Sequence, residues 1–212
     1  MSEFHLVLVA PDATLFAALG EYFDELPRVE IVAGRFEELP EFDCMVSAAN
    51  SFGLMDGGVD AAITRFFGTA LMERVQKRII DEYLGEQNVG TSFIVETGHP
   101  RHPFLAHTPT MRVPLGISRT DNVYRAMWAM LLAVRQHNRI SERRIQVVAC
   151  PGLGTGTGAV PPIEAARQMS MAYRNYHNPP TGISWRFANA RQRQVGHGGD
   201  LGFEFPPEGQ DE

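Results

Sequence analysis

Cysteine is scarce in this chain. Cys44 and Cys150 are the only two among 212 residues, and each stands at the end of an apolar run. Two buried, reduced thiols exclude a disulfide-stabilised extracellular scaffold and favour an intracellular, cytoplasmic location. The N-terminus lacks a basic lead, and its apolar stretch is too short for a signal peptide. No apolar run approaches the length that spans a membrane, so we expect a soluble protein with no membrane partner.

Positive charge is also in short supply, because 19 Lys and Arg stand against 25 Asp and Glu, giving a net charge of −6. Nucleic-acid-binding domains usually present a basic face, so this balance argues against a nucleic-acid partner. An anionic small ligand is still compatible, because backbone N–H groups bind phosphate without net positive charge. The length fits one domain, which we place at residues 1–189, followed by a flexible acidic tail at residues 190–212.

Short apolar runs alternate with stretches of helical periodicity along the chain. The expected strands are residues 4–10, 29–32, 44–46, 89–96, 104–113, 145–150 and 182–189. The expected helices are residues 12–26, 59–68, 71–84, 121–138 and 163–176. Several of the strand runs are apolar without alternation, which is typical of strands that are buried on both faces. This alternation of strands and helices predicts an α/β fold.

The stretch at residues 44–63 combines a buried strand, a glycine-bearing loop and a helix start. Such an order makes an anion site, because glycines allow close backbone approach and a helix N-terminus has unpaired donors. Asn50 follows the strand, and Asp60 lies on the first helical turn, where we expect the helix dipole to keep its carboxylate ionised. An equally good interpretation is that Asn50 is a turn residue and Asp60 an ordinary helix-start acid.

A second glycine-rich loop, PGLGTGTGAVPP at residues 151–162, again follows an apolar strand and precedes a helix. It is not a Walker sequence, because no lysine follows the glycines. The donors of the two loops together would converge on a diphosphate. A metal site at His99 and His102 is disfavoured, because no third ligand stands at a recognisable spacing. We therefore expect neither a metal nor a cofactor.

With both loops in view, the chain resembles the macro domain family over residues 29–176. Residues 46–50 (VSAAN) resemble the family's V-N-A-A-N, and residues 57–63 (GGVDAAI) resemble its G-G-V-D-G-A-I. Residues 106–108 (AHT) resemble its I-H-T strand. Residues 151–161 resemble the second loop, P-x-x-S-T-G-x-x-x-x-P.

The resemblance implies a three-layer α/β/α sandwich with a mixed central sheet and ADP-ribose, or an ADP-ribosylated protein, as the partner. The diphosphate would lie between the two loops. The catalytic candidates are Asn50, which would hold the distal ribose, and Asp60, which would position or activate a water at the anomeric carbon. The ligand-binding candidates implied by the two loops are Ala49, Gly57, Gly58, Val59, Gly154, Thr155, Gly156, Thr157 and Gly158.

The chain differs from the family pattern at three positions. Arg35 stands where the family has an Asp that binds the adenine amino group, and Arg has donors only, so we predict weak discrimination among bases. Gly158 replaces the usual aromatic residue, and Gly154 replaces the serine of S-T-G. The leading hypothesis is a macro domain that hydrolyses ADP-ribosyl bonds or an ADP-ribose derivative. The alternatives are a non-catalytic ADP-ribose-binding module and a structural assembly protein that has lost the ligand.

Overall fold

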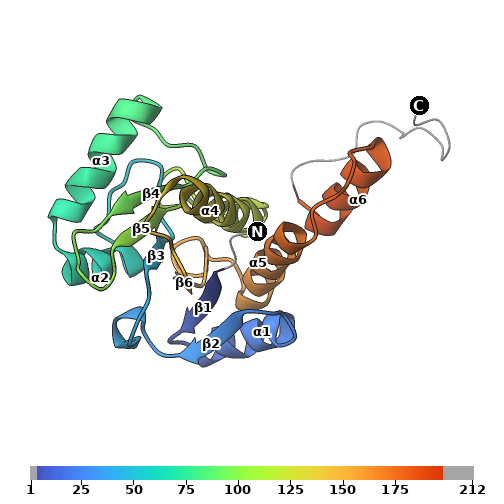
Figure 1. Cartoon of the computed structure of the whole chain (residues 1–212). Coiled ribbons are helices and arrows are strands. Elements are labelled where there is room, and N and C mark those ends of the chain that lie inside the picture. The colour runs from blue at the N-terminus through green and yellow to red at the C-terminus, as the bar shows by residue number, and fades with distance from the viewer. Residues whose placement is uncertain (1–3, 198–212) are drawn as a thin grey trace.

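The computed structural model describes residues 4–197 as a central sheet between two layers of helices (Figure 1). This arrangement confirms the predicted α/β/α sandwich. The six strands are β1 (His5–Ala10), β2 (Val29–Ala33), β3 (Cys44–Ser47), β4 (Phe93–Glu96), β5 (Phe104–His107) and β6 (Val147–Pro151). Their order is β2-β1-β6-β3-β5-β4. All neighbouring pairs are parallel except β4 and β5, so the sheet is mixed as expected.

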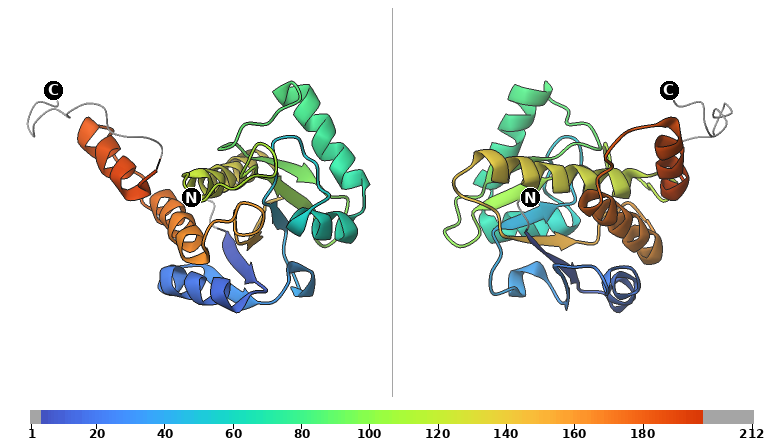
Figure 2. Two further views of the ribbon diagram at one scale, coloured as in Figure 1. Left: turned by 180° about the vertical axis from the view of Figure 1, so that it is seen from behind. Right: turned by 45° about the vertical axis from the view of Figure 1, so that its right-hand side comes forward.

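Helices cover both faces of the sheet (Figure 2). One face packs against α1 (Ala13–Phe23), α4 (Asn122–Ile140) and α5 (Pro162–His177), and the other packs against α2 (Gly58–Phe67) and α3 (Ala70–Tyr83). Successive strand residues point to opposite faces, so Cys44 and Val46 join the first core and Met45 joins the second. This two-sided burial explains why the central strands are apolar at every position.

The predicted strands at residues 89–96 and 104–113 are longer than those observed, since β4 and β5 are short. Beyond β5 the chain stays extended and pairs with the segment that follows β3. The Ala49 N–H donates to the Thr108 carbonyl at 3.1 Å, and the Thr110 N–H donates to the Ala49 carbonyl at 2.9 Å. These bonds bring Thr110 alongside the candidate site.

The strand predicted at residues 182–189 is wrong, because the chain forms helix α6 (Trp185–Val195) there. Ser184 caps this helix by accepting the Phe187 N–H at 3.2 Å. The Arg191 guanidinium lies over the Phe187 ring and also over Trp128 of α4, which holds the helix in place. The helix lies beyond α5, on the side of the molecule opposite α2 and α3 (Figure 1).

Helix α6 also crosses the predicted domain boundary at residue 190, so residues 190–195 are helical. The rest of the predicted acidic tail, from residue 198, lies outside the described residues. Both cysteines are buried free thiols, as predicted, and burial raises the pKa of each. Across residues 4–197, no helix combines the length and apolar character needed to cross a membrane.

Candidate functional site

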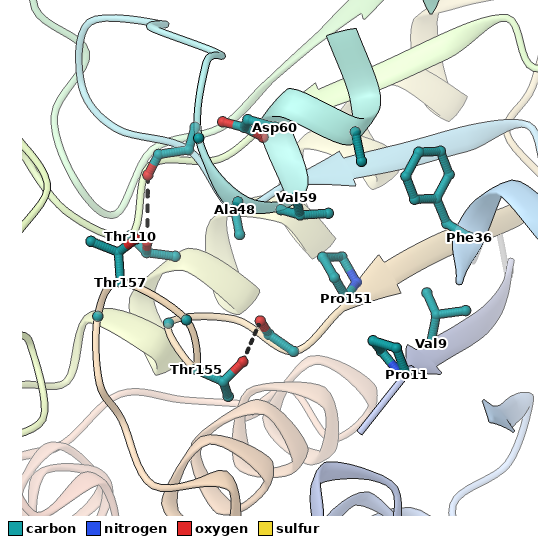
Figure 3. A pocket seen from close by; sticks show the side chains of 18 of the residues that line it. Val9, Pro11, Phe36, Ala48, Val59, Asp60, Thr110, Pro151, Thr155 and Thr157 are labelled. Atoms are coloured by element: carbon teal, nitrogen blue, oxygen red, sulfur yellow. Dashed lines mark hydrogen bonds between the residues drawn. The ribbon is translucent and has the colours of Figure 1, made fainter. Parts of the chain in front are cut away.

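Two loops meet at the carboxyl edge of the sheet, because β3 and β6 are parallel neighbours. The first loop (residues 48–57) joins β3 to α2, and the second loop (residues 152–161) joins β6 to α5. They border a pocket of about 580 Å³ (Figure 3), a volume typical of small-molecule sites. The predicted site residues that line it are Ala49, Asn50, Gly57, Gly58, Val59, Asp60, Gly154, Thr155, Gly156, Thr157 and Gly158.

Unpaired backbone donors line both sides of this pocket. In the second loop, the N–H groups of residues 154–158 donate to no other group in the described part of the chain. On the opposite side, the same holds for the N–H groups of Gly58 and Val59 in the first turn of α2. Ala61 is the first residue of this turn to donate within the helix, to the Gly57 carbonyl at 3.1 Å. Two sets of unpaired N–H groups, on residues that line the same pocket, are a suitable cradle for an anion.

The second loop is held in shape by its own carbonyls. The Gly154 carbonyl accepts the Val160 N–H at 3.1 Å, and the Gly158 carbonyl accepts the Ile117 N–H at 2.8 Å. A Cβ atom at Gly158 would lie 2.5 Å from the Gly154 carbonyl oxygen. This close approach leaves no room for a side chain there. Gly156, in contrast, is exposed, and a Cβ atom on it would meet nothing within 4 Å.

Asn50 lines the pocket, but its amide is engaged by its own loop. Its Oδ1 accepts the N–H groups of Phe52 at 3.0 Å and Leu54 at 3.3 Å, and its Nδ2 donates to the Leu54 carbonyl at 2.8 Å. This is the turn-stabilising role that an asparagine commonly has. A ligand would have to compete with these bonds to engage the Asn50 amide.

Asp60 is an acid in the pocket wall, and its side chain is almost fully buried. The Ser47 Oγ donates a hydrogen bond of 2.7 Å to Asp60 Oδ1. Burial raises the pKa of the Asp60 carboxyl to about 7; the Ser47 hydrogen bond opposes this rise, and Asp56 adds to it. The expectation that the helix dipole keeps Asp60 fully ionised is therefore wrong, because desolvation outweighs it. A carboxyl group with this pKa can exchange a proton near neutral pH.

His99, His102 and His107 have structural surroundings. His107 is fully buried, its Nδ1 lies 2.6 Å from Gln87 Oε1, and burial lowers its pKa to about 3. The rings of His99 and His102 stack with centroids 4.8 Å apart, and His102 Nδ1 lies 2.8 Å from the Phe42 carbonyl oxygen. Over the part of the chain that the structure describes, no group of three His, Cys, Asp or Glu side chains could hold a metal ion.

The contribution of residues 9–11 to one end of the pocket was not anticipated from the sequence. Val9, Pro11, Phe36 and Pro151 form an apolar wall there, on the side away from Asp60 (Figure 3). The end of β1 contributes because β1 is a parallel neighbour of β6, so its carboxyl end reaches the same edge. The strand at residues 4–10 was predicted from its apolar run. Its position beside β6 in the sheet, which brings its end to the pocket, could not be read from the sequence.

The fold and the two loops define an α/β/α protein with a pocket suited to an anionic ligand. The family model described as Macro domain matches residues 46–169. An uncharacterised protein of Aquifex aeolicus is 33% identical over 149 residues, which is 70% of this chain and 82% of that protein. The chain belongs to the macro domain family.

Two further similarities are to proteins whose names mention ADP-ribose. A Salmonella gallinarum protein named O-acetyl-ADP-ribose deacetylase is 29% identical over 143 residues, covering 66% of this chain and 73% of that protein. A variant of the Oceanobacillus iheyensis macrodomain, solved with ADPR, superposes with a TM-score of 0.57 at 21% identity. That match covers 76% of this chain and 88% of the other. At this identity the structural similarity supports the fold alone.

Proposed function

We propose that this macro domain binds ADP-ribose and hydrolyses a bond at its distal ribose, in an ADP-ribosylated protein or an ADP-ribose derivative. The diphosphate lies between the second loop and the first turn of α2, because residues with unpaired N–H groups line the pocket in both segments. The base lies against the apolar wall, and the distal ribose lies toward Asp60. The names of the Salmonella and Oceanobacillus proteins support this choice of ligand.

The main support for a hydrolytic function is the position and the raised pKa of the Asp60 carboxyl group. This carboxyl lies in the pocket wall, Ser47 fixes it at 2.7 Å, and its pKa is about 7. A base with a pKa near the working pH combines a useful fraction of carboxylate with enough basicity to accept a proton. Asp60 would take a proton from a water molecule as that water attacks the anomeric carbon of the distal ribose. The bond from this carbon to the modified group breaks, and that group leaves with the electron pair. Such general-base assistance typically contributes about 10²–10⁴-fold in rate.

A non-catalytic binding module is the second candidate, and the hydrogen bonds of Asn50 favour it. Because the Asn50 amide is committed to Phe52 and Leu54, it is not free to orient the ribose as a catalytic asparagine would. The third alternative, a structural protein without a ligand, is disfavoured because the pocket is open and its donors are unpaired.

Binding is tested by thermal unfolding with and without ADP-ribose. A ligand that binds only the folded state raises the melting temperature. Gly156→Val places a branched side chain at the lining of the pocket, so it should abolish the shift. It should keep the melting temperature of the free protein, because an added Cβ meets no neighbouring atom within 4 Å. A wild-type protein with no shift at millimolar ADP-ribose would refute the binding proposal.

Catalysis is tested by release of ADP-ribose from a mono-ADP-ribosylated protein. Asp60→Ala should reduce hydrolysis by about 10²-fold or more, while the affinity for ADP-ribose stays within a few-fold. Asn50→Ala should disturb the first loop and weaken binding as well. If the wild-type protein binds ADP-ribose and releases none, the binding module is the correct alternative.

A further inference from the structure

The apolar end of the pocket is built largely by residues that precede the family match. Val9 and Pro11 come from the end of β1, Phe36 follows β2, and Pro151 ends β6. Flat apolar surfaces of this kind suit the face of a nucleotide base. Hydrogen-bonding groups at the rim would then decide which base is accepted.

An acidic and a basic residue, Asp12 and Arg35, lie at this end of the pocket, just beyond the ends of two neighbouring strands. Ala10 of β1 is paired with Ala33 of β2, and the Gly34 N–H donates to the Ala10 carbonyl at 3.2 Å. Asp12 and Arg35 each come two residues after a member of that pair, and both line the pocket. The two residues therefore follow the ends of adjacent strands, and both border this end of the pocket.

Asp12 is already fixed in place before any ligand arrives. Its Oδ1 accepts the Leu15 N–H at 2.9 Å as the cap of α1, and this bond restricts the side chain. The Asp12 carboxylate has only acceptor sites, and the bond from the Leu15 N–H occupies one of them. The remaining sites are available to a ligand. A preorganised acceptor of this kind favours a partner with N–H donors and repels a carbonyl oxygen.

We propose that Asp12 determines base selectivity by accepting a hydrogen bond from the exocyclic amino group of adenine. The inference rests on the proposed binding of ADP-ribose and deepens it. Arg35 contributes its donors and its planar surface to the same base. The sequence alone predicts weak discrimination among nucleotide bases, because Arg35 has no hydrogen-bond acceptor. In this proposal Asp12 supplies the missing acceptor.

The decisive comparison uses ADP-ribose and its hypoxanthine analogue, inosine diphosphate ribose, which replaces the amino group with a carbonyl. Calorimetric titration of the wild-type protein should show a preference for ADP-ribose of about tenfold or more, the range expected for a hydrogen bond to a charged group. Asp12→Asn should reduce this preference to below about threefold. Asparagine caps helices as well as aspartate does, and its amide can donate to the carbonyl of hypoxanthine.

Two control variants test whether the loss of preference is specific to Asp12. Asp24→Asn removes the same charge at the other end of α1, away from the pocket, and should keep the wild-type preference. Glu37→Gln tests the other acid at this end of the pocket and should also keep it. Equal affinities of the wild-type protein for both ligands, or a preference that survives in Asp12→Asn, would overturn the proposal. Binding of neither ligand would instead refute the proposed function.

Discussion

The environment of Asp60 predicts a measurable effect on stability. Asp60→Asn keeps the shape of the side chain and its ability to accept the Ser47 hydrogen bond, but removes the charge. In the folded protein, burial raises the pKa of Asp60 from 3.8 to about 7. One pKa unit corresponds to about 1.4 kcal/mol, so ionising Asp60 in the folded state costs about 4 kcal/mol more than in the unfolded chain.

The direction of the pH dependence follows from where the proton is bound. Between pH 3.8 and about 7, Asp60 is protonated in the folded state and ionised in the unfolded state. The wild-type free energy of unfolding therefore falls as the pH rises through this range. The Asp60→Asn variant lacks this pH-dependent contribution to the free energy of unfolding, because asparagine does not titrate. Its stability relative to wild type should rise by about 4 kcal/mol from pH 4 to pH 7 and then level off.

Urea unfolding of both proteins at several pH values between 4 and 8 measures this difference. His107 acts in the opposite direction, because burial lowers its pKa to about 3, but it contributes equally to both proteins and cancels. Glu25→Gln, at an exposed acid, is the control for removal of one carboxyl group and should give a much smaller change than Asp60→Asn. A flat difference for Asp60→Asn would refute the assignment of a raised pKa to Asp60.

Three further predictions concern single contacts. Ser47→Ala removes the bond that lowers the pKa of Asp60, so the rising limb of the pH–rate profile should move to higher pH, and Ser47→Thr should restore it. Gly158→Ala places a Cβ atom 2.5 Å from a backbone oxygen, so it should abolish ADP-ribose binding in calorimetry and cost about 1–3 kcal/mol in urea unfolding. Asn138→Ala leaves the buried N–H and carbonyl of Ile145 unpaired, so it should lower the free energy of unfolding by at least about 2 kcal/mol.

The sequence was informative where local patterns alone determine structure. The apolar runs of β1, β3 and β6 marked central strands, because a strand buried on both faces has no polar positions. The glycine loops marked the two sides of the pocket, since each follows such a strand and precedes a helix. All the predicted site residues line one pocket for this reason, while their roles stay predictions.

Features that depend on distant residues could not be read in this way. The expectation that Asp60 is ionised considered only its own helix, whereas its pKa is set by burial and by Ser47 on a strand. The segment at residues 182–189 has aromatic residues two apart, as a strand would. Its helix, however, depends on the Ser184 cap and on Arg191 packing across to α4.

The pocket therefore has three parts with separate structural origins. The cradle consists of backbone N–H groups, so it depends on the shape of the loops and on glycines such as Gly158. The end near Asp60 depends on one buried carboxyl and the hydroxyl that holds it. The end near Asp12 depends on the N-terminal strand and helix, which lie outside the family match. Substitutions of Asp60 and of Asp12 should consequently change chemistry and base selectivity separately, whereas a change of loop shape should remove ligand binding and therefore both of the other properties.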